Sequence, residues 1–372
     1  MGFFSSDLAA HAAILSDASL RVLHICARNS SEESLRLSST KCNSAANGGP
    51  SVLHEKRVSL DSRAQRRYLA MLQGRASSAE QLPLCEQGRG GMSPYDLLAL
   101  VVRFDDARHE RICQAAVRNA TSSSYFLTSS HEQAVYASQS LLNANSLAIL
   151  RSSSFDFVAC ERVAAALRHD LSAAATAAAA TAGTTAGTTA SQPVRLPAPP
   201  SSSAAAATAT SATPRPLTAP LLPDGLLVDA GAVMELLGLR ANKLGKPHVS
   251  LIYAANETAG PRLLRACSAA AAAGSHPAAD ACVARYLSHN PPGSYFEFHG
   301  MRRPEQLVRD PAAHAFCFGL KFVAPAQLCR YKEARFQRWH WAHDRSDAQS
   351  LRGWMLEQQK AAQGPSRSTK AR

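Results

Sequence analysis

Residues 315–322 read AFCFGLKF, and this stretch carries the clearest secondary-structure signal in the chain. Large apolar side chains alternate there with other residues. Such a period of two is typical of a β-strand with one buried face. Residues 294–299, which read SYFEFH, repeat the alternation. Both stretches therefore predict strands in the C-terminal part of the chain.

Outward from this stretch, short apolar runs alternate with segments of helical spacing. Further strands are expected at 20–26, 125–127, 226–228 and 249–253. Helices are expected at 63–73, 93–104, 131–143, 155–167, 232–239, 261–273 and 278–287. The pattern predicts an α/β or α+β fold that is rich in helix.

The helix expected at 93–104 has the most complete set of signals. Ser93 suits an N-cap, and Pro94 suits the first helical position. Leu97, Leu100, Val101 and Phe104 then follow at helical spacing, at i, i+3, i+4 and i+7.

A tract dominated by Ala, Thr, Ser, Pro and Gly divides the chain. It has too little apolar bulk to offset the entropy lost on ordering, so we expect a disordered linker or an inserted loop. Whether the flanking halves share one core stays open at this stage. The predicted organisation is a helix-rich mixed domain, the disordered tract, an α+β domain with a basic aromatic C-terminal element, and a basic tail, at 1–170, 171–223, 224–345 and 346–372.

Composition limits the compartment and the partners. The chain has a formal charge of +12, and residues 301–372 hold 14 basic against six acidic residues, which favours a polyanionic or acidic partner. Nine scattered cysteines without a C-x-x-C pair favour a reducing, intracellular compartment, but cytoplasm, nucleus and organelle matrix are not distinguished.

No transmembrane segment is expected. Gly2 fits the myristoylation frame, but the bulky Phe3 fits it poorly, so membrane anchoring is not expected.

Local catalytic motifs are missing from the sequence. The segment from Gly238 to Lys246 has six residues between its glycines and ends before a proline, so it does not make a phosphate-binding loop. Cys317 and Cys329 are too far apart for an ordinary zinc finger with His340 and His343. We therefore expect no cofactor, no metal and no catalytic residue that a motif could identify.

The strongest functional signal is the segment 330–345, which reads RYKEARFQRWHWAHDR. Cationic side chains can neutralise phosphates and aromatic ones can stack on unpaired bases, while Trp, Tyr and Arg also dominate protein–protein hot spots. A third interpretation buries the aromatic side chains within their own domain. The candidate residues for binding nucleic acid or a protein partner are Arg330, Lys332, Arg335, Arg338, Trp339, Trp341 and Arg345.

Taken together, these features predict a non-catalytic subunit or adaptor of a larger assembly, such as a ribonucleoprotein. It would contact protein subunits, or RNA or DNA, through the basic aromatic region. The alternative is an α/β enzyme whose active site gathers dispersed residues, because the lack of a local motif does not exclude one.

Overall fold

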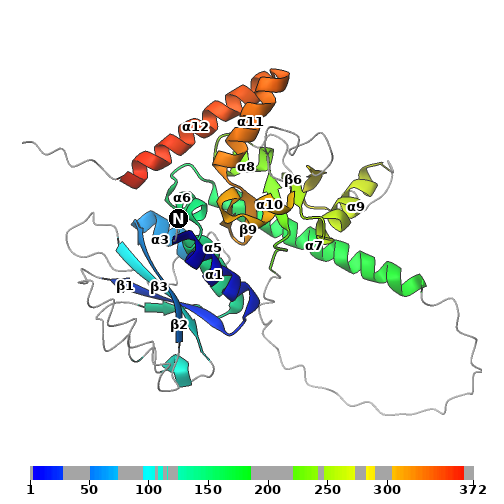
Figure 1. Cartoon of the computed structure of the whole chain (residues 1–372). Helices are drawn as coiled ribbons and strands as arrows, with labels where there is room; N and C mark the ends of the chain where they lie inside the picture. The colour runs from blue at the N-terminus through cyan, green and yellow to red at the C-terminus, as the bar shows by residue number, and fades with distance from the viewer. Residues whose placement is uncertain are drawn as a thin grey trace, which may run out of the picture.

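The computed structural model describes residues 3–27, 51–73, 95–104, 108–111, 115, 125–185, 221–241, 247–272, 282–289 and 304–363. In these residues the chain forms two β-sheets with helices packed on them (Figure 1). The mixture of sheets and helices confirms the coarse fold class expected from the sequence. None of the described helices is both long and apolar enough to cross a bilayer.

The first sheet is antiparallel and has the strand order β2-β3-β1-β4. Leu23 of β1 pairs with Leu100 of β3 and, on its other side, with Leu127 of β4. Expected strands at 20–26 and 125–127 are confirmed. The four strands are β1 (Leu20–Ala27), β2 (Ser51–Leu60), β3 (Tyr95–Arg103) and β4 (Tyr125–Leu127).

Strand β3 shows that the helix prediction for 93–104 is wrong. Residues 97–102 are apolar at every position, and β3 lies between β1 and β2. Leu97 and Val101 belong to the main core on one face, while Leu98 and Leu100 belong to a second buried cluster on the other. A strand that is buried on both faces shows no polar alternation, so its apolar run can also fit helical spacing.

Among the described residues, three helices pack on the first sheet and a fourth leads away from it. Ser130 and Asn143 cap the third and fourth of them, since their side chains accept hydrogen bonds from the backbone N–H groups of Gln133 and Ser146. Such caps fix where each helix begins. The helices are α1 (Phe3–Ser16), α3 (Ser62–Gln73), α5 (His131–Leu141) and α6 (Ala144–Arg151).

Helix α7 (Phe157–Thr185) continues past residue 171, where the disordered tract was predicted to begin. Alanine has the highest helix propensity, so the Ala-rich start of the tract prolongs the helix. Asp170 also fixes this part of α7, because its buried carboxylate accepts hydrogen bonds from the backbone of Val283 and Ala284. The prediction of disorder is therefore wrong for residues 171–179, whereas 186–220 lie outside the described residues.

The second sheet is mixed and has the strand order β7-β6-β5-β9-β8. It contains the strands expected at 226–228 and 249–253. Its strands are β5 (Leu226–Asp229), β6 (His248–Tyr253), β7 (Arg285–Ser288), β8 (His314–Cys317) and β9 (Leu320–Val323). Its helices are α8 (Gly231–Leu236), α9 (Ala259–Ala272) and α10 (Pro304–Arg309).

Two expectations for this half need comment. The helix predicted over 278–287 is wrong at its end, where β7 pairs in parallel with β6. Small residues favoured a helix there, but the available sheet edge gives residues 285–288 their partner. The strand predicted at 294–299 lies outside the described residues.

The alternating stretch 315–322 forms two strands instead of one. Strands β8 and β9 pair antiparallel, with Cys317 opposite Leu320, so Phe318 and Gly319 form the turn. Both turn residues have positive φ, 51° and 73°, which is the backbone of a two-residue type I′ turn. The apolar alternation in the sequence continues through this turn, because Phe318 is itself buried, so the turn was not predicted.

Substitution of Gly319 with alanine should lower the free energy of unfolding by about 2–3 kcal/mol. The left-handed backbone disfavours a side chain, and a Cβ there would lie 2.6 Å from Cε1 of Tyr136. Chemical denaturation would measure the loss. Gly353→Ala on the C-terminal helix is the matched control, because its Cβ would meet nothing within 4 Å and alanine favours helix. If Gly319→Ala has the same free energy of unfolding as Gly353→Ala, the assigned turn is wrong.

One hydrophobic core unites the two halves of the described chain. Its buried members include Ile149 and Cys160 from before the tract, and Leu227 and Leu351 from after it. The ring of Phe155 also stacks near Phe322, with the centroids 6.0 Å apart. The question that the sequence left open is thus answered, because both halves contribute to a common core.

Cysteines have two structural roles among the described residues. Cys160, Cys317 and Cys329 are buried free thiols, as expected for cysteines that act as small hydrophobes. Cys267 and Cys282 form a disulfide that joins α9 to the segment before β7. Their spacing in the sequence gave no reason to pair them, and the reducing compartment stays a prediction.

Candidate partner-binding site at the tip of the C-terminal hairpin

The C-terminal segment forms a helical hairpin of α11 (Pro325–Trp339) and α12 (Ala342–Gln363), at the top of Figure 1. The sharp connection depends on His340, whose φ of 55° places it in the left-handed region and ends α11. Its backbone N–H donates to the carbonyl oxygen of Phe336 at 2.8 Å. Most of the segment predicted as a basic tail, 346–372, is therefore helix up to Gln363.

A buried ion-pair network holds the two helices together. Lys332 Nζ lies 2.9 Å from Oδ1 of Asp344 and 2.8 Å from Oδ2 of Asp347. Arg240, from the loop after α8, pairs with both oxygens of Asp347 at 2.8 Å. Lys332 and Asp344 have side-chain exposures of only 6% and 0%, so water does not stabilise their charges. Each charge is instead stabilised by the opposite charges beside it.

The aromatic side chains at the turn stack on one another. The ring centroids of Trp339 and Trp341 are 4.8 Å apart at 28°, and those of Trp341 and His343 are 5.6 Å apart at 24°. The Arg335 guanidinium lies 4.6 Å from the centroid of Trp341, and its Nε is 3.1 Å from Oδ2 of Asp344. The buried carboxylate thus positions the cation against the indole. We call Arg335, Trp339, Trp341 and His343 the aromatic tip.

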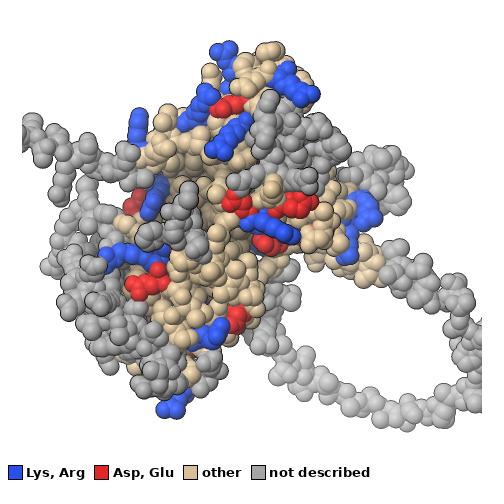
Figure 2. Space-filling model, in the orientation of Figure 1, with Lys and Arg blue, Asp and Glu red and all other residues tan. Residues whose placement is uncertain are grey.

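Both tryptophans of the aromatic tip are at the surface. Trp339 is 38% and Trp341 is 43% exposed, which is unusual for side chains of this size. Exposed arginines lie on the same hairpin, and Figure 2 shows Lys and Arg side chains over the hairpin at the top of the view. These arginines are Arg330, Arg338 and Arg345.

The structure divides the seven residues predicted for binding into two groups. Five are exposed on the hairpin: Arg330, Arg338, Trp339, Trp341 and Arg345. Arg335 is mostly buried beneath the indoles, and Lys332 is taken up by the ion pairs. The third tryptophan, Trp354, is buried, and its indole N–H donates to Ser154 Oγ at 2.9 Å.

A second polar cluster is centred on β9 and was not foreseen from the sequence. Lys321 of β9 is 6% exposed, and its ammonium donates to the carbonyl oxygens of Asp224 and Val308, at 2.7 and 3.0 Å, and pairs with the Asp224 carboxylate. Burial lowers the pKa of Lys321. A lysine within an otherwise apolar strand was the available signal for this cluster.

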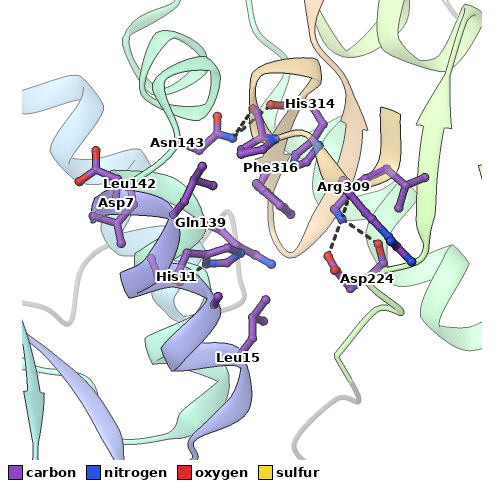
Figure 3. Close-up of a pocket in the computed structure, with 16 residues that line it drawn as sticks. Asp7, His11, Leu15, Gln139, Leu142, Asn143, Asp224, Arg309, His314 and Phe316 are labelled. Atoms are coloured by element: carbon purple, nitrogen blue, oxygen red, sulfur yellow. Dashed lines mark hydrogen bonds and ion pairs between the residues drawn. The ribbon is translucent and has the colours of Figure 1, made fainter. Parts of the chain in front are cut away.

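Two histidines border the same cluster. Burial lowers the pKa of His314 to about 3, with the Lys321 charge acting in the same direction. Burial also lowers the pKa of His11 to about 4, while Asp224 opposes the shift. Both imidazoles are therefore neutral at pH 7. These residues line the cavity shown in Figure 3.

The cavity gathers dispersed polar residues, as the enzyme alternative requires. Ser138 Oγ lies 2.7 Å from His11 Nδ1, yet it also donates to the carbonyl oxygen of Val135 within its own helix. Lys321 is fully bonded. Neither side chain is therefore available as an activated nucleophile.

Among the described residues, one group of side chains has the spacing of metal ligands: Asp170, Cys267 and Cys282. The two sulfurs are joined in the disulfide, and the Asp170 carboxylate already accepts hydrogen bonds, including one from Tyr286 Oη at 2.8 Å. All three side chains therefore already have partners within the fold.

The aromatic tip and the cavity thus differ in chemistry. One presents exposed indoles and cations, and the other presents neutral imidazoles in a recess. No protein-family model, curated protein or solved structure matches the chain.

Proposed function

We propose that the protein is a non-catalytic binding subunit that uses the aromatic tip to dock an acidic segment of a partner protein. The observation that carries the proposal is the preformed stack of two exposed indoles over Arg335. Exposed aromatic side chains and arginines are the usual anchors of protein interfaces. Because the stack already has one geometry, little side-chain entropy is lost when a partner binds.

The stack favours a protein partner over single-stranded nucleic acid. Base stacking needs an open aromatic face. Trp339, His343 and Arg335 all lie within 6 Å of the Trp341 centroid, so the Trp341 faces are largely covered. The exposed indole edges are instead suited to packing against aliphatic side chains, with indole N–H groups at the rim.

Charge favours an acidic partner. Residues 325–363 hold seven Lys or Arg against four Asp or Glu. Asp344 and Asp347 are buried in the ion-pair network, and Glu333 pairs with Arg352. The field around the aromatic tip is therefore positive, which speeds association with acidic segments.

Trp341→Ala should weaken binding of the partner by about 30-fold or more, the effect expected for a hot spot worth about 2 kcal/mol. The protein should remain folded, because 43% of the side chain is already exposed. Leu356→Ala is the matched control: Leu356 is a 57% exposed apolar side chain on α12, away from the turn. Partner affinity and circular dichroism of each variant would be compared.

Identification of the partner uses a photo-crosslinking residue placed at position 341 or, as control, at position 356. The proposal expects one protein that crosslinks from 341 and is lost when Trp339→Ala is added. Crosslinks to RNA or DNA at 341 would overturn the choice of a protein partner. A crosslinking pattern that is identical from both positions would overturn the proposed site itself.

A further inference from the structure

The disulfide between Cys267 and Cys282 lies beside a buried carboxylate of α7. Its two sulfurs and one carboxylate oxygen of Asp170 all lie within 4.8 Å of one another. Cys267 belongs to α9, which lies alongside α7 (Figure 1), and Cys282 comes just before β7. Three parts of the fold therefore place sulfur and carboxylate groups at one point.

The charge of Asp170 is poorly compensated for a carboxylate that is buried. Its side chain is 1% exposed, and its ion-pair partner in the described part of the chain is His169, whose side chain is 62% exposed. The backbone N–H groups of Val283 and Ala284 and the hydroxyl of Tyr286 donate hydrogen bonds to it. These bonds stabilise the negative charge without neutralising it, so a cation beside the carboxylate would be favourable.

A reducing compartment, which the scattered cysteines predict, would open the disulfide. A dithiol reductant supplies two electrons and two protons: the S–S bond breaks, both sulfurs become thiols, and the reductant is oxidised to its own disulfide. Cys267 and Cys282 are both partly exposed, so the reductant can reach them. Their Cα atoms are 5.9 Å apart, and the two thiols therefore stay next to each other and to Asp170 as long as the backbone keeps its place.

Two thiols and one carboxylate are a ligand set that suits zinc. Zn²⁺ binds thiolate sulfur at about 2.3 Å and carboxylate oxygen at about 2.0–2.2 Å, in tetrahedral geometry. Ligand atoms of such a site are about 3.5–4 Å apart, which is within the 4.8 Å that the three atoms span here. Calcium and magnesium prefer oxygen ligands alone, and iron–sulfur clusters need more cysteines. The donor set therefore favours zinc.

The surroundings of Asp170 already hold its carboxylate in one orientation. Hydrogen bonds to a ligating carboxylate fix its direction toward the metal, and Tyr286, Val283 and Ala284 make such bonds. His169 Nδ1 lies 3.0 Å from Oδ1 of Asp170, and because its ring is mostly exposed it can turn to solvent and leave that oxygen to a metal. Water would take the fourth position on the ion.

We propose that the reduced protein binds one Zn²⁺ through the sulfurs of Cys267 and Cys282 and the carboxylate of Asp170. Binding forms two Zn–S bonds and one Zn–O bond and releases the two thiol protons. The oxidised protein does not bind the ion, because both sulfurs are held in the S–S bond. The disulfide and the zinc ion are thus alternative links between α9 and the start of β7, and the redox state selects between them. The site is independent of the aromatic tip.

Metal titration of the full-length protein tests the proposal. The protein is reduced with a dithiol, freed of it under inert gas and titrated with Zn²⁺ in competition with a chromophoric chelator. Reduced wild-type protein should bind one Zn²⁺ per chain more than Cys267→Ser/Cys282→Ser. Titration with Co²⁺ should give a thiolate-to-cobalt charge-transfer band that is lost in this variant and in oxidised wild-type protein. Asp170→Asn should weaken zinc binding about tenfold or more.

Cys160→Ala/Cys329→Ala is the matched control, because it removes two of the other thiols and should bind zinc like wild-type protein. Circular dichroism of each metal-free variant shows whether it is folded, and the cysteine variants test the site even if Asp170→Asn is not. The proposal is overturned if reduced wild-type protein binds no more zinc than Cys267→Ser/Cys282→Ser. A cobalt band of equal strength in the oxidised protein would also overturn it, as would a folded Asp170→Asn variant with unchanged zinc affinity.

Discussion

Replacement of Lys332 with methionine is expected to lower the free energy of unfolding by about 3–5 kcal/mol. The ammonium is the shared partner of Asp344 and Asp347, both of which are buried. Methionine fills the volume but leaves Asp344 with Arg335 and the exposed His343, and removes one partner of Asp347. A buried carboxylate without its counter-charge is among the most costly changes that a single substitution makes.

Denaturant titration of Lys332→Met would measure this loss. Arg352→Gln serves as the matched control, because it breaks an ion pair whose members are 59% and 31% exposed and should cost less than about 1 kcal/mol. Addition of Asp344→Asn to Lys332→Met should recover part of the loss, since the amide carries no charge. If the single variant is as stable as the control, the network does not hold the hairpin.

Acid should destabilise the protein well above the pH at which carboxylates titrate. The pKa of His314 is lowered from 6.5 to about 3, so between these values the unfolded chain binds a proton that the folded protein excludes. The stability that this group contributes is complete above pH 6.5 and is lost as the pH falls. From pH 6.5 to 4.5 the loss for His314 is on the order of 2 kcal/mol. His11, whose pKa is lowered to about 4, adds to it with the same sign.

Unfolding free energies at pH 6.5, 5.5 and 4.5 would be compared for wild-type protein and His314→Gln. Glutamine can still donate to the carbonyl oxygen of Leu307, which His314 Nδ1 faces. The variant should lose less stability with falling pH, by about 1.4 kcal/mol per pH unit. Parallel pH dependences for the two proteins would show that His314 takes up its proton in the folded state.

The sequence predicts the elements whose length and spacing leave one interpretation, and it fails where they do not. Strand β1 was recognised as a short apolar run, and helix α3 from its helical spacing. Strand β3 has no polar face and was mistaken for a helix. The Phe318–Gly319 turn was missed because an apolar residue occupies a positive-φ position that usually carries Asn, Asp or Gly.

The aromatic tip and the cavity differ in how far apart their residues lie in the sequence. The aromatic tip comes from neighbouring residues, so its candidates could be found in one segment, although the burial of Lys332 needed the α12 carboxylates to be located. The cavity joins His11, Gln139, Arg309 and Lys321. No local pattern connects residues so far apart, and only the fold places them together.

The contact between Trp354 and Ser154 has a consequence for how the protein is made. The two residues are 200 positions apart in the chain. At about 5–20 residues per second, a ribosome needs on the order of 10–40 s to synthesise the intervening segment. During that time the apolar surface around α6 and the start of α7, which the second half later covers, remains open to water. Exposed apolar surface of this kind promotes aggregation, so we expect the nascent chain to benefit from chaperones until α12 has been synthesised.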